Sequence, residues 1–214
     1  MLNASMAKRK QHVPNSGRPG HHGGSENRGR ERRNTRARDG GGGRHWLYGH
    51  HAVFAALANP ERRIGALHVT AAFKEAHAEN PALSDALVVT RQDLDGALPE
   101  GAVHQGIALQ TAPLPQLDLH DILGDSPPTA DDCVAVLDQA TDPRNIGAVM
   151  RTAAAFDVRC IVVQDRNAPP ETGAMAKAAS GALEKMPLVQ VTNLARSLES
   201  LKEAGFWCVG LDPE

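Results

Sequence analysis

The fold is decided by the stretch Cys133-Val-Ala-Val-Leu-Asp-Gln-Ala-Thr-Asp-Pro-Arg-Asn-Ile-Gly-Ala-Val-Met-Arg151. It opens with an uninterrupted apolar run, Cys133–Leu137, which is typical of a buried strand. A polar loop with an Asp-Pro turn follows, and an amphipathic helical pattern then extends over Ile146–Phe156. A strand, a loop and a helix in this order predict the repeating unit of a parallel α/β sheet.

The same alternation continues toward the C-terminus. Further strands are predicted at Cys160–Val163, Leu188–Val191 and Phe206–Gly210, and further helices at Glu171–Ser180 and Leu194–Ala204. The last helix has Asn193 as its expected N-cap and ends at Gly205. The sequence stops at Glu214, directly after a strand, where a parallel sheet would continue with a crossover helix. We therefore expect the chain to be truncated at its C-terminus.

Toward the N-terminus, residues 45–112 predict a smaller mixed α/β domain. Its expected helices are Gly49–Ala58, Ala71–Glu79 and Gln92–Leu98, and its expected strands are Ile64–Val69, Leu87–Val89 and Gly106–Thr111. Residues 113–131 predict a proline-marked linker that contains one weak helix. The parallel-sheet domain then occupies residues 132–214.

Residues 1–44 predict a disordered basic tail. They are rich in Gly, Arg and His and contain too few apolar residues to form a core. Residues 1–40 carry ten Lys or Arg against three acidic residues, about +7 by that count, whereas the rest of the chain carries about −9. This asymmetry favours a polyanion partner for the tail, and a solvated tail without a specific ligand fits the charges equally well.

Composition excludes several classes of protein. No apolar run reaches membrane-spanning length, and the N-terminus has no secretory signal. The three cysteines lie in separate apolar runs with no CxxC pair, so we expect buried thiols in a reducing compartment rather than disulfides or a zinc site. Neither a phosphate-binding loop nor the glycine fingerprint of dinucleotide-binding oxidoreductases is present. The adjacent His50 and His51 predict RNA contact or plain surface rather than a metal site.

The loop between Asp138 and Gly147 follows a strand, where open parallel sheets bind their ligands. Asn145 carries both a donor and an acceptor, Gly147 allows close approach at the helix start, and Arg151 lies one turn further along the helix. The planar fork of an arginine suits a phosphate or ribose-phosphate. An ordinary turn, with Asn145 as a cap and Arg151 on the surface, fits the same residues, and the pattern alone leaves both open.

Three segments resemble one family. The run Leu137–Val158 is similar to the first signature motif of the SpoU RNA 2′-O-ribose methyltransferases of the SPOUT superfamily, and Ala176–Glu184 followed by Met186-Pro187 is similar to a later family segment. Gly101–Ile107, together with Tyr48-Gly-His50, resembles the family's small substrate-binding domain. Its His-Gln-Gly resembles the branch that methylates a guanosine ribose of 23S rRNA.

The resemblance implies an L30e-like α/β substrate-binding domain followed by a SPOUT (α/β knot) methyltransferase domain that is incomplete at the C-terminus. It implies transfer of a methyl group from S-adenosyl-L-methionine to RNA, rRNA before tRNA, by a cytoplasmic enzyme that is a homodimer when full length, without a metal or a membrane. The site residues that it implies are, for catalysis, Asn145 and Arg151; for RNA binding, Arg144, Tyr48, His50, His104 and Gln105; and for cofactor binding, Gly210 and Leu211. For His104 and Gln105, structuring a turn is an equal alternative.

The family's second motif, a Gly-x-Glu-x-x-Gly loop, and its third, with Ser-Leu-Asn, are expected beyond residue 214, along with the knot and most of the cofactor pocket. We therefore expect this chain alone to bind S-adenosyl-L-methionine poorly and to be inactive. The alternative is a non-catalytic RNA-binding protein. For Arg151 we predict that it holds a phosphate and stabilises developing negative charge, because a guanidinium stays protonated and cannot act as a base.

Overall fold

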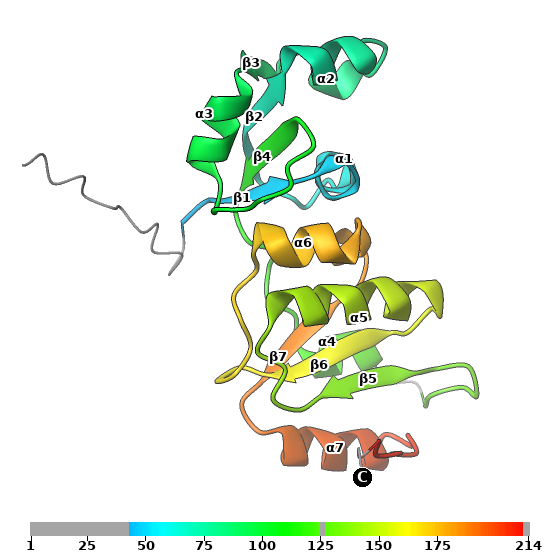
Figure 1. The fold of residues 1–214 in the computed structure, drawn as a ribbon. Helices are drawn as coiled ribbons and strands as arrows, with labels where there is room; N and C mark the ends of the chain where they lie inside the picture. Colours follow the sequence, from blue (N-terminus) through cyan, green and yellow to red (C-terminus); the bar gives the residue numbers. More distant parts are fainter. Residues whose placement is uncertain (1–42, 125–126, 212–214) are drawn as a thin grey trace, which may run out of the picture. The chain divides into compact units, whose positions relative to one another are not determined.

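The computed structural model describes residues 43–124 and 127–211 (Figure 1). Residues 45–112 contain a four-stranded sheet and residues 132–211 a three-stranded one, and we call these two parts the small lobe and the large lobe. The predicted basic tail lies almost wholly outside the described residues. The mixed sheet followed by a parallel sheet confirms the predicted fold class.

The sheet of the small lobe has the order β1-β4-β2-β3. Strand β4 pairs antiparallel with β1 and with β2, and β2 pairs parallel with β3 at the edge. The strands are β1 (His45–Tyr48), β2 (Ile64–Thr70), β3 (Leu87–Val89) and β4 (Ile107–Thr111), and the helices are α1 (His50–Ala58), α2 (Ala71–Ala76), η1 (Pro81–Leu83) and α3 (Arg91–Ala97). All six predicted elements are present. Strand β1 and the 3₁₀ turn η1 are additions.

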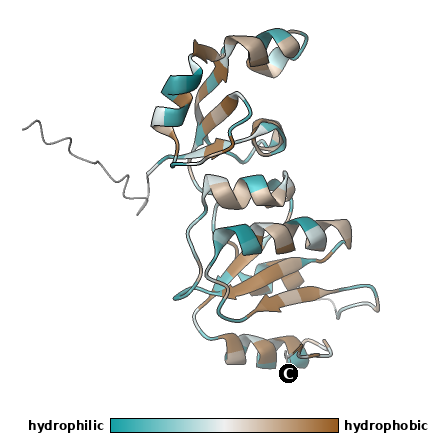
Figure 2. Ribbon diagram, viewed as in Figure 1, coloured by the Kyte–Doolittle hydropathy of each residue, from teal (hydrophilic) through white to brown (hydrophobic). Residues whose placement is uncertain are grey.

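The sheet of the large lobe has the order β5-β6-β7 and is parallel throughout, as predicted. Its strands are β5 (Val134–Leu137), β6 (Cys160–Gln164) and β7 (Leu188–Val191), and its helices are α5 (Pro143–Ala155), α6 (Gly173–Ala179), η2 (Ala182–Glu184) and α7 (Leu194–Glu203). Figure 2 shows the apolar colouring of these strands between the helical layers. The short α4 (Leu119–Leu123), from the predicted linker, packs with α7 against one face of this sheet.

Helix α5 begins three residues earlier than predicted, at Pro143 rather than Ile146. The side chain of Asp142 accepts a hydrogen bond of 2.8 Å from the backbone N–H of Arg144, which makes Asp142 the N-cap. Proline is well tolerated at the first helical position because its missing N–H has no helical partner there. The turn that was predicted as loop is therefore the first turn of the helix.

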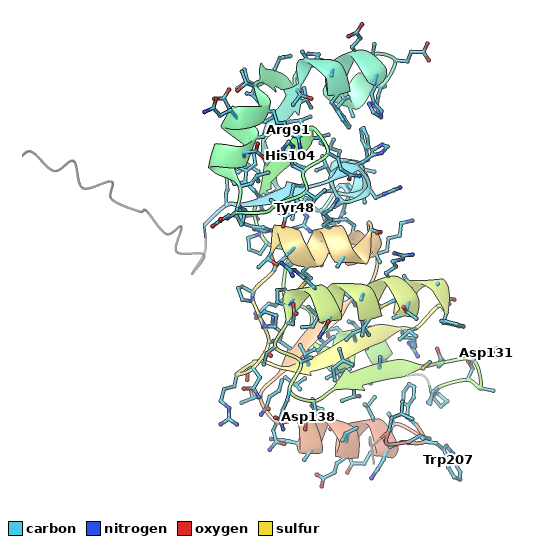
Figure 3. The ribbon with its side chains drawn as sticks, viewed as in Figure 1. Tyr48, Arg91, His104, Asp131, Asp138 and Trp207 are labelled. Carbon is cyan, nitrogen blue, oxygen red and sulfur yellow. The ribbon has the colours of Figure 1, made fainter. Side chains whose placement is uncertain are left out.

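The strand predicted at Phe206–Gly210 is absent, and this prediction was wrong. An extended segment becomes a strand only when the backbone of a neighbour bonds to it, and no described strand pairs with this one. Its apolar side chains are consequently open, with Trp207 96 % and Val209 86 % exposed. Figure 3 places Trp207 at the outside of the molecule, beyond α7.

The prediction of buried cysteines holds for one residue of the three. Cys160 is buried in β6, where burial raises the pKa of its thiol to about 11. Cys133 and Cys208 are exposed, because the first precedes β5 and the second lies in the unpaired C-terminal segment. Among the described helices, none combines the length and apolarity that a membrane crossing requires.

Candidate functional site

The first turn of α5 presents two of the predicted site residues to solvent. Arg144 and Asn145 are both exposed. Because Asp142 caps the helix, Asn145 does not have the capping role that the sequence left open. Its amide lies on the surface at the carboxyl end of β5, where open parallel sheets bind ligands.

Gly147 makes the close approach that was predicted, and its neighbour is α6. A Cβ atom built on Gly147 would overlap the carbonyl oxygen of Met175 and lie 2.8 Å from the Cβ of Ala178. The missing side chain therefore lets α5 and α6 pack backbone against backbone. The glycine of the signature stretch serves helix packing in this structure.

Arg151 lines a cleft between α1, α5 and the turn that follows α6. The cleft has a volume of about 460 Å³, and we call it the α1–α5 cleft. It is lined by His50, His51, Phe54 and Ala55 from α1, Arg151, Ala154 and Ala155 from α5, and Ala179, Ser180, Gly181, Ala182 and Lys185 beyond. Two of these lining residues, Arg151 and Lys185, are cationic, three carry rings, and none is acidic. The cleft suits a flat anionic ligand.

His50 and Gln105, both predicted to contact RNA, meet at the start of α1. The backbone N–H of His50 donates a hydrogen bond of 3.1 Å to Oε1 of Gln105, and Nζ of Lys177 donates another of 3.1 Å to the same oxygen. Gln105 adopts a left-handed backbone, with φ of 58°. It thereby joins the start of α1 to α6 beside the cleft.

Tyr48 and His104 lie apart from this cleft, and both are buried, with 6 % and 2 % of their surfaces exposed (Figure 3). Nδ1 of His104 accepts a hydrogen bond of 3.0 Å from the N–H of Gly106, and its Nε2 lies 3.1 Å from Oδ1 of Asp95. His104 therefore structures the turn before β4. In this structure the protein covers both rings, and their contact with RNA stays a prediction.

Burial lowers the pKa of His50, and the neighbouring His77 and His51 lower it further. The unfolded chain therefore takes up the proton of this histidine at higher pH than the folded chain does. The neutral form contributes stability that is present above pH 6.5 and is lost as the pH falls through the folded-state pKa.

We expect the melting temperature to be lower at pH 5.5 than at pH 7.5, and His50→Phe to reduce that difference. Phenylalanine keeps the ring contacts but binds no proton. Thermal unfolding at both pH values measures the effect. His120→Phe, at an exposed position of α4, is the matched control and should retain the wild-type difference. An undiminished difference in His50→Phe would contradict this role of His50.

A buried ion network joins the two lobes, and no motif in the sequence indicates it. Arg62, whose side chain has no exposed surface, makes a two-pronged contact with Glu184, from Nη2 to Oε1 at 2.6 Å and from Nε to Oε2 at 3.1 Å. Nη1 of Arg62 lies 2.5 Å from Oε1 of Glu171. The same carboxylate oxygen lies 3.0 Å from Nε2 of His45. Asn59 donates a further hydrogen bond of 2.8 Å to Glu184.

The charges of this network stabilise one another. Burial alone would raise the pKa of Glu171, but the hydrogen bond with His45 and the attraction of Arg62 lower it. Burial alone would lower the pKa of Arg62, but its contacts with Glu184 and Glu171 raise it. No local sequence pattern indicates such a network, because Arg62 and each of its two glutamate partners lie more than 100 residues apart along the chain.

The residues predicted to bind the cofactor lie in the open C-terminal segment. A Cβ on Gly210 would meet no atom within 4 Å, and Leu211 is 97 % exposed. The described residues thus form no enclosure for a cofactor at this loop. Their role stays a prediction. Among the described residues, no three His, Cys, Asp or Glu side chains are arranged to hold a metal ion.

Two family models match separate parts of this chain. The model of the SpoU rRNA Methylase family matches residues 132–214. The model described as RNA 2′-O ribose methyltransferase substrate binding matches residues 46–117. Residues 118–131 lie between the two matches.

Several curated proteins are similar over most of the described chain. A 23S rRNA (guanosine-2′-O-)-methyltransferase of Vibrio vulnificus is 39 % identical over 77 % of this chain and 69 % of its own length. An uncharacterised tRNA/rRNA methyltransferase of Synechocystis is 38 % identical over 77 % of this chain, which spans only 44 % of that protein.

Solved structures agree on the fold. The SpoU methyltransferase AviRb of Streptomyces viridochromogenes, in complex with AdoMet, has a TM-score of 0.56 at 20 % identity and covers 76 % of this chain, which spans 62 % of that structure. A likeness at this identity concerns the fold alone. Two family models match in sequence order, and the chain spans 69 % of the Vibrio vulnificus relative at 39 % identity, so this chain belongs to the SpoU family of RNA methyltransferases.

Proposed function

We propose that this chain is the RNA-facing part of an S-adenosyl-L-methionine-dependent methyltransferase that modifies the ribose 2′-hydroxyl of a guanosine in large-subunit rRNA. Family membership supports the reaction, and the Vibrio relatives, which are 23S rRNA (guanosine-2′-O-)-methyltransferases, support the substrate. The observation that carries the proposal is the α1–α5 cleft. It brings Arg151 of the methylase region together with His50 and His51 of the substrate-binding region.

When bound, the cofactor supplies the methyl group, and the residues of this chain position the RNA. Methyl transfer to a hydroxyl is an in-line displacement, so that the orientation of the ribose governs the rate. The guanidinium of Arg151 stays protonated and exposed. We infer that it binds the phosphate beside the target ribose and stabilises the negative charge that develops on the attacking oxygen. Asn145 and Arg144, exposed on the first turn of the same helix, contact the ribose-phosphate backbone.

In the complete protein, Arg151→Ala is expected to lower the methylation rate about 100-fold, the usual effect of removing one group that stabilises transition-state charge. Arg151→Lys should recover part of this loss, because lysine keeps the charge without the planar fork. Incorporation of a labelled methyl group into an rRNA transcript gives the rate, and nucleoside analysis should identify 2′-O-methylguanosine. RNA affinity is measured in parallel by filter binding.

Arg196→Ala, at an exposed position of α7, is the matched control and should keep the wild-type rate. An unchanged rate and affinity in both Arg151 variants would remove Arg151 from the mechanism. A complete wild-type protein that binds rRNA but yields no 2′-O-methylguanosine would overturn the reaction itself. That result would favour the second candidate, a non-catalytic RNA-binding protein, which the α1–α5 cleft also fits.

We propose further that residues 45–112 and 132–214 act as the substrate-binding and methyltransferase domains, and that the complete enzyme is a homodimer of the cytoplasm. The exposed apolar side chains of Trp207, Val209 and Leu211 support an additional protein contact at the end of this chain. The ribosomal RNA named for the relatives supports the location.

A further inference from the structure

Three histidines and two phenylalanines gather on α1, on α2 and at the residue that caps α2, although Phe, Trp and Tyr make up only 3 % of the chain. The rings of Phe73 and His77 stack at 4.2 Å between centroids, with 20° between their planes. His50 meets His77 edge-on at 5.0 Å and Phe54 edge-on at 4.7 Å. His51 stacks on His50 at 5.3 Å and 24°. We call these five residues the ring stack.

The ring stack runs from the core to the solvent. Phe73 is 8 % exposed, His50, Phe54 and His77 are half-buried, and His51 is exposed. Packing of the core accounts for Phe73 but not for the outermost ring. The ring of His51 lies nearly parallel to that of His50, and His51 is exposed to solvent. An exposed ring in this orientation can receive another flat ring by stacking.

The open end of the ring stack borders the positive side chains of the α1–α5 cleft. His50, His51 and Phe54 form one wall of the cleft, and Arg151 and Lys185 lie along it as well. A ligand with a flat aromatic ring and a nearby negative charge matches both features, and an RNA nucleotide has both. An acidic peptide has the negative charge to pair with Arg151 and Lys185, but its carboxylate side chains carry no flat aromatic ring.

We propose that the ring stack is a platform for an unpaired RNA base, which stacks on His51 while the phosphate of the same nucleotide contacts Arg151 and Lys185. This inference rests on the proposed function, because RNA is the partner in both. Every base has a flat face, so such a platform accepts any base. It therefore binds a nucleotide that flanks the modified one and places the target ribose, without selecting the sequence.

Burial and the neighbouring His77 and His51 lower the pKa of His50, which favours its neutral form at physiological pH. A neutral imidazole stacks on a base through its ring rather than through a net charge. In this arrangement the rings of the platform contact the base of a nucleotide. Arg151 and Lys185 contact its phosphate.

The test uses this chain and two single-stranded RNAs of equal length, one with 2-aminopurine at its centre and one abasic at that position. Fluorescence anisotropy measures the affinity of both, and quenching of 2-aminopurine reports stacking. His51→Ala should weaken binding of the base-containing RNA about tenfold and abolish the quenching, since stacking of one base contributes on this order. It should leave binding of the abasic RNA unchanged.

His51→Phe should restore both signals, because phenylalanine supplies a flat ring at the same exposed helical position. His120→Ala, an exposed histidine on α4, is the matched control and should behave as wild type. Equal wild-type affinity for the two RNAs, equal weakening of both by His51→Ala, or displacement of the RNA by an acidic peptide as readily as by unlabelled RNA would each overturn the platform. Methylation of rRNA by the complete protein would be unaffected by such a result and tests the proposed function separately.

Discussion

Replacement of Arg62 by alanine is expected to lower the free energy of unfolding by about 3–5 kcal/mol, the usual cost of breaking a buried ion pair from one side. The side chain of Arg62 is fully buried between Glu171 and Glu184, whose own side chains are only 12 % and 4 % exposed. The variant would leave two carboxylates in the interior without their shared cation. Because Arg62 belongs to the small lobe and both glutamates to the large lobe, contact between the lobes should weaken with it.

Urea unfolding followed by circular dichroism measures this change. Arg63→Ala is the matched control, because the neighbouring arginine is exposed and its replacement should alter the free energy of unfolding by less than about 0.5 kcal/mol. Arg62→Lys should fall between the two, since lysine keeps the charge but cannot make the two-pronged contact with Glu184. A loss below about 1 kcal/mol in Arg62→Ala would show that the network contributes little.

The second large effect is expected at Gly147. Gly147→Val should lower the free energy of unfolding by roughly 3–4 kcal/mol, at the upper end for overpacked sites. Even the first added carbon would overlap the backbone carbonyl of Met175, and a backbone atom of α6 cannot swing aside as a flexible side chain can. Helices α5 and α6 would have to separate, which would also displace Arg151 at the rim of the cleft.

Gly96→Val is the matched control for this substitution. Gly96 lies inside α3, and a Cβ there would meet no atom within 4 Å. Valine has a somewhat higher helix propensity than glycine, so this variant should be as stable as wild type or slightly more stable. Denaturant unfolding compares the two. Equal stabilities for Gly147→Val and Gly96→Val would mean that the two helices can move apart at little cost.

Much of the fold could be predicted because its signals are local. Apolar runs such as that of β6 indicate buried parallel strands, and Asn193 and Gly205 mark the ends of α7 where the structure has them. Strand β1 was missed because it has only four residues and begins with the polar His45, which leaves too short an apolar run to indicate a strand. The strand predicted at Phe206 has the right composition, yet no described partner bonds to it.

The candidate site was predictable only in part. The signature stretch led to Arg151 and Asn145, and the structure places both at the surface of α5. The sequence could not show that Tyr48 and His104 are buried, since burial depends on residues that are distant in the sequence. The ring stack was equally hidden, because it joins histidines of α1 to Phe73 and His77 of α2, which come together only when the chain folds.

Except for β1 and the strand expected at Phe206, the order of strands and helices, the parallel sheet and the family resemblance are readable from the sequence. Capping residues, apolar periodicity and a contiguous motif are local features of a chain. The places where charges and rings meet follow from the tertiary structure alone. Arg62 finds its carboxylates more than 100 residues away, and the α1–α5 cleft takes its rings from one lobe and Arg151 from the other. Such contacts follow from the packing of α1, α5 and α6, and packing is set by the three-dimensional fit of side chains.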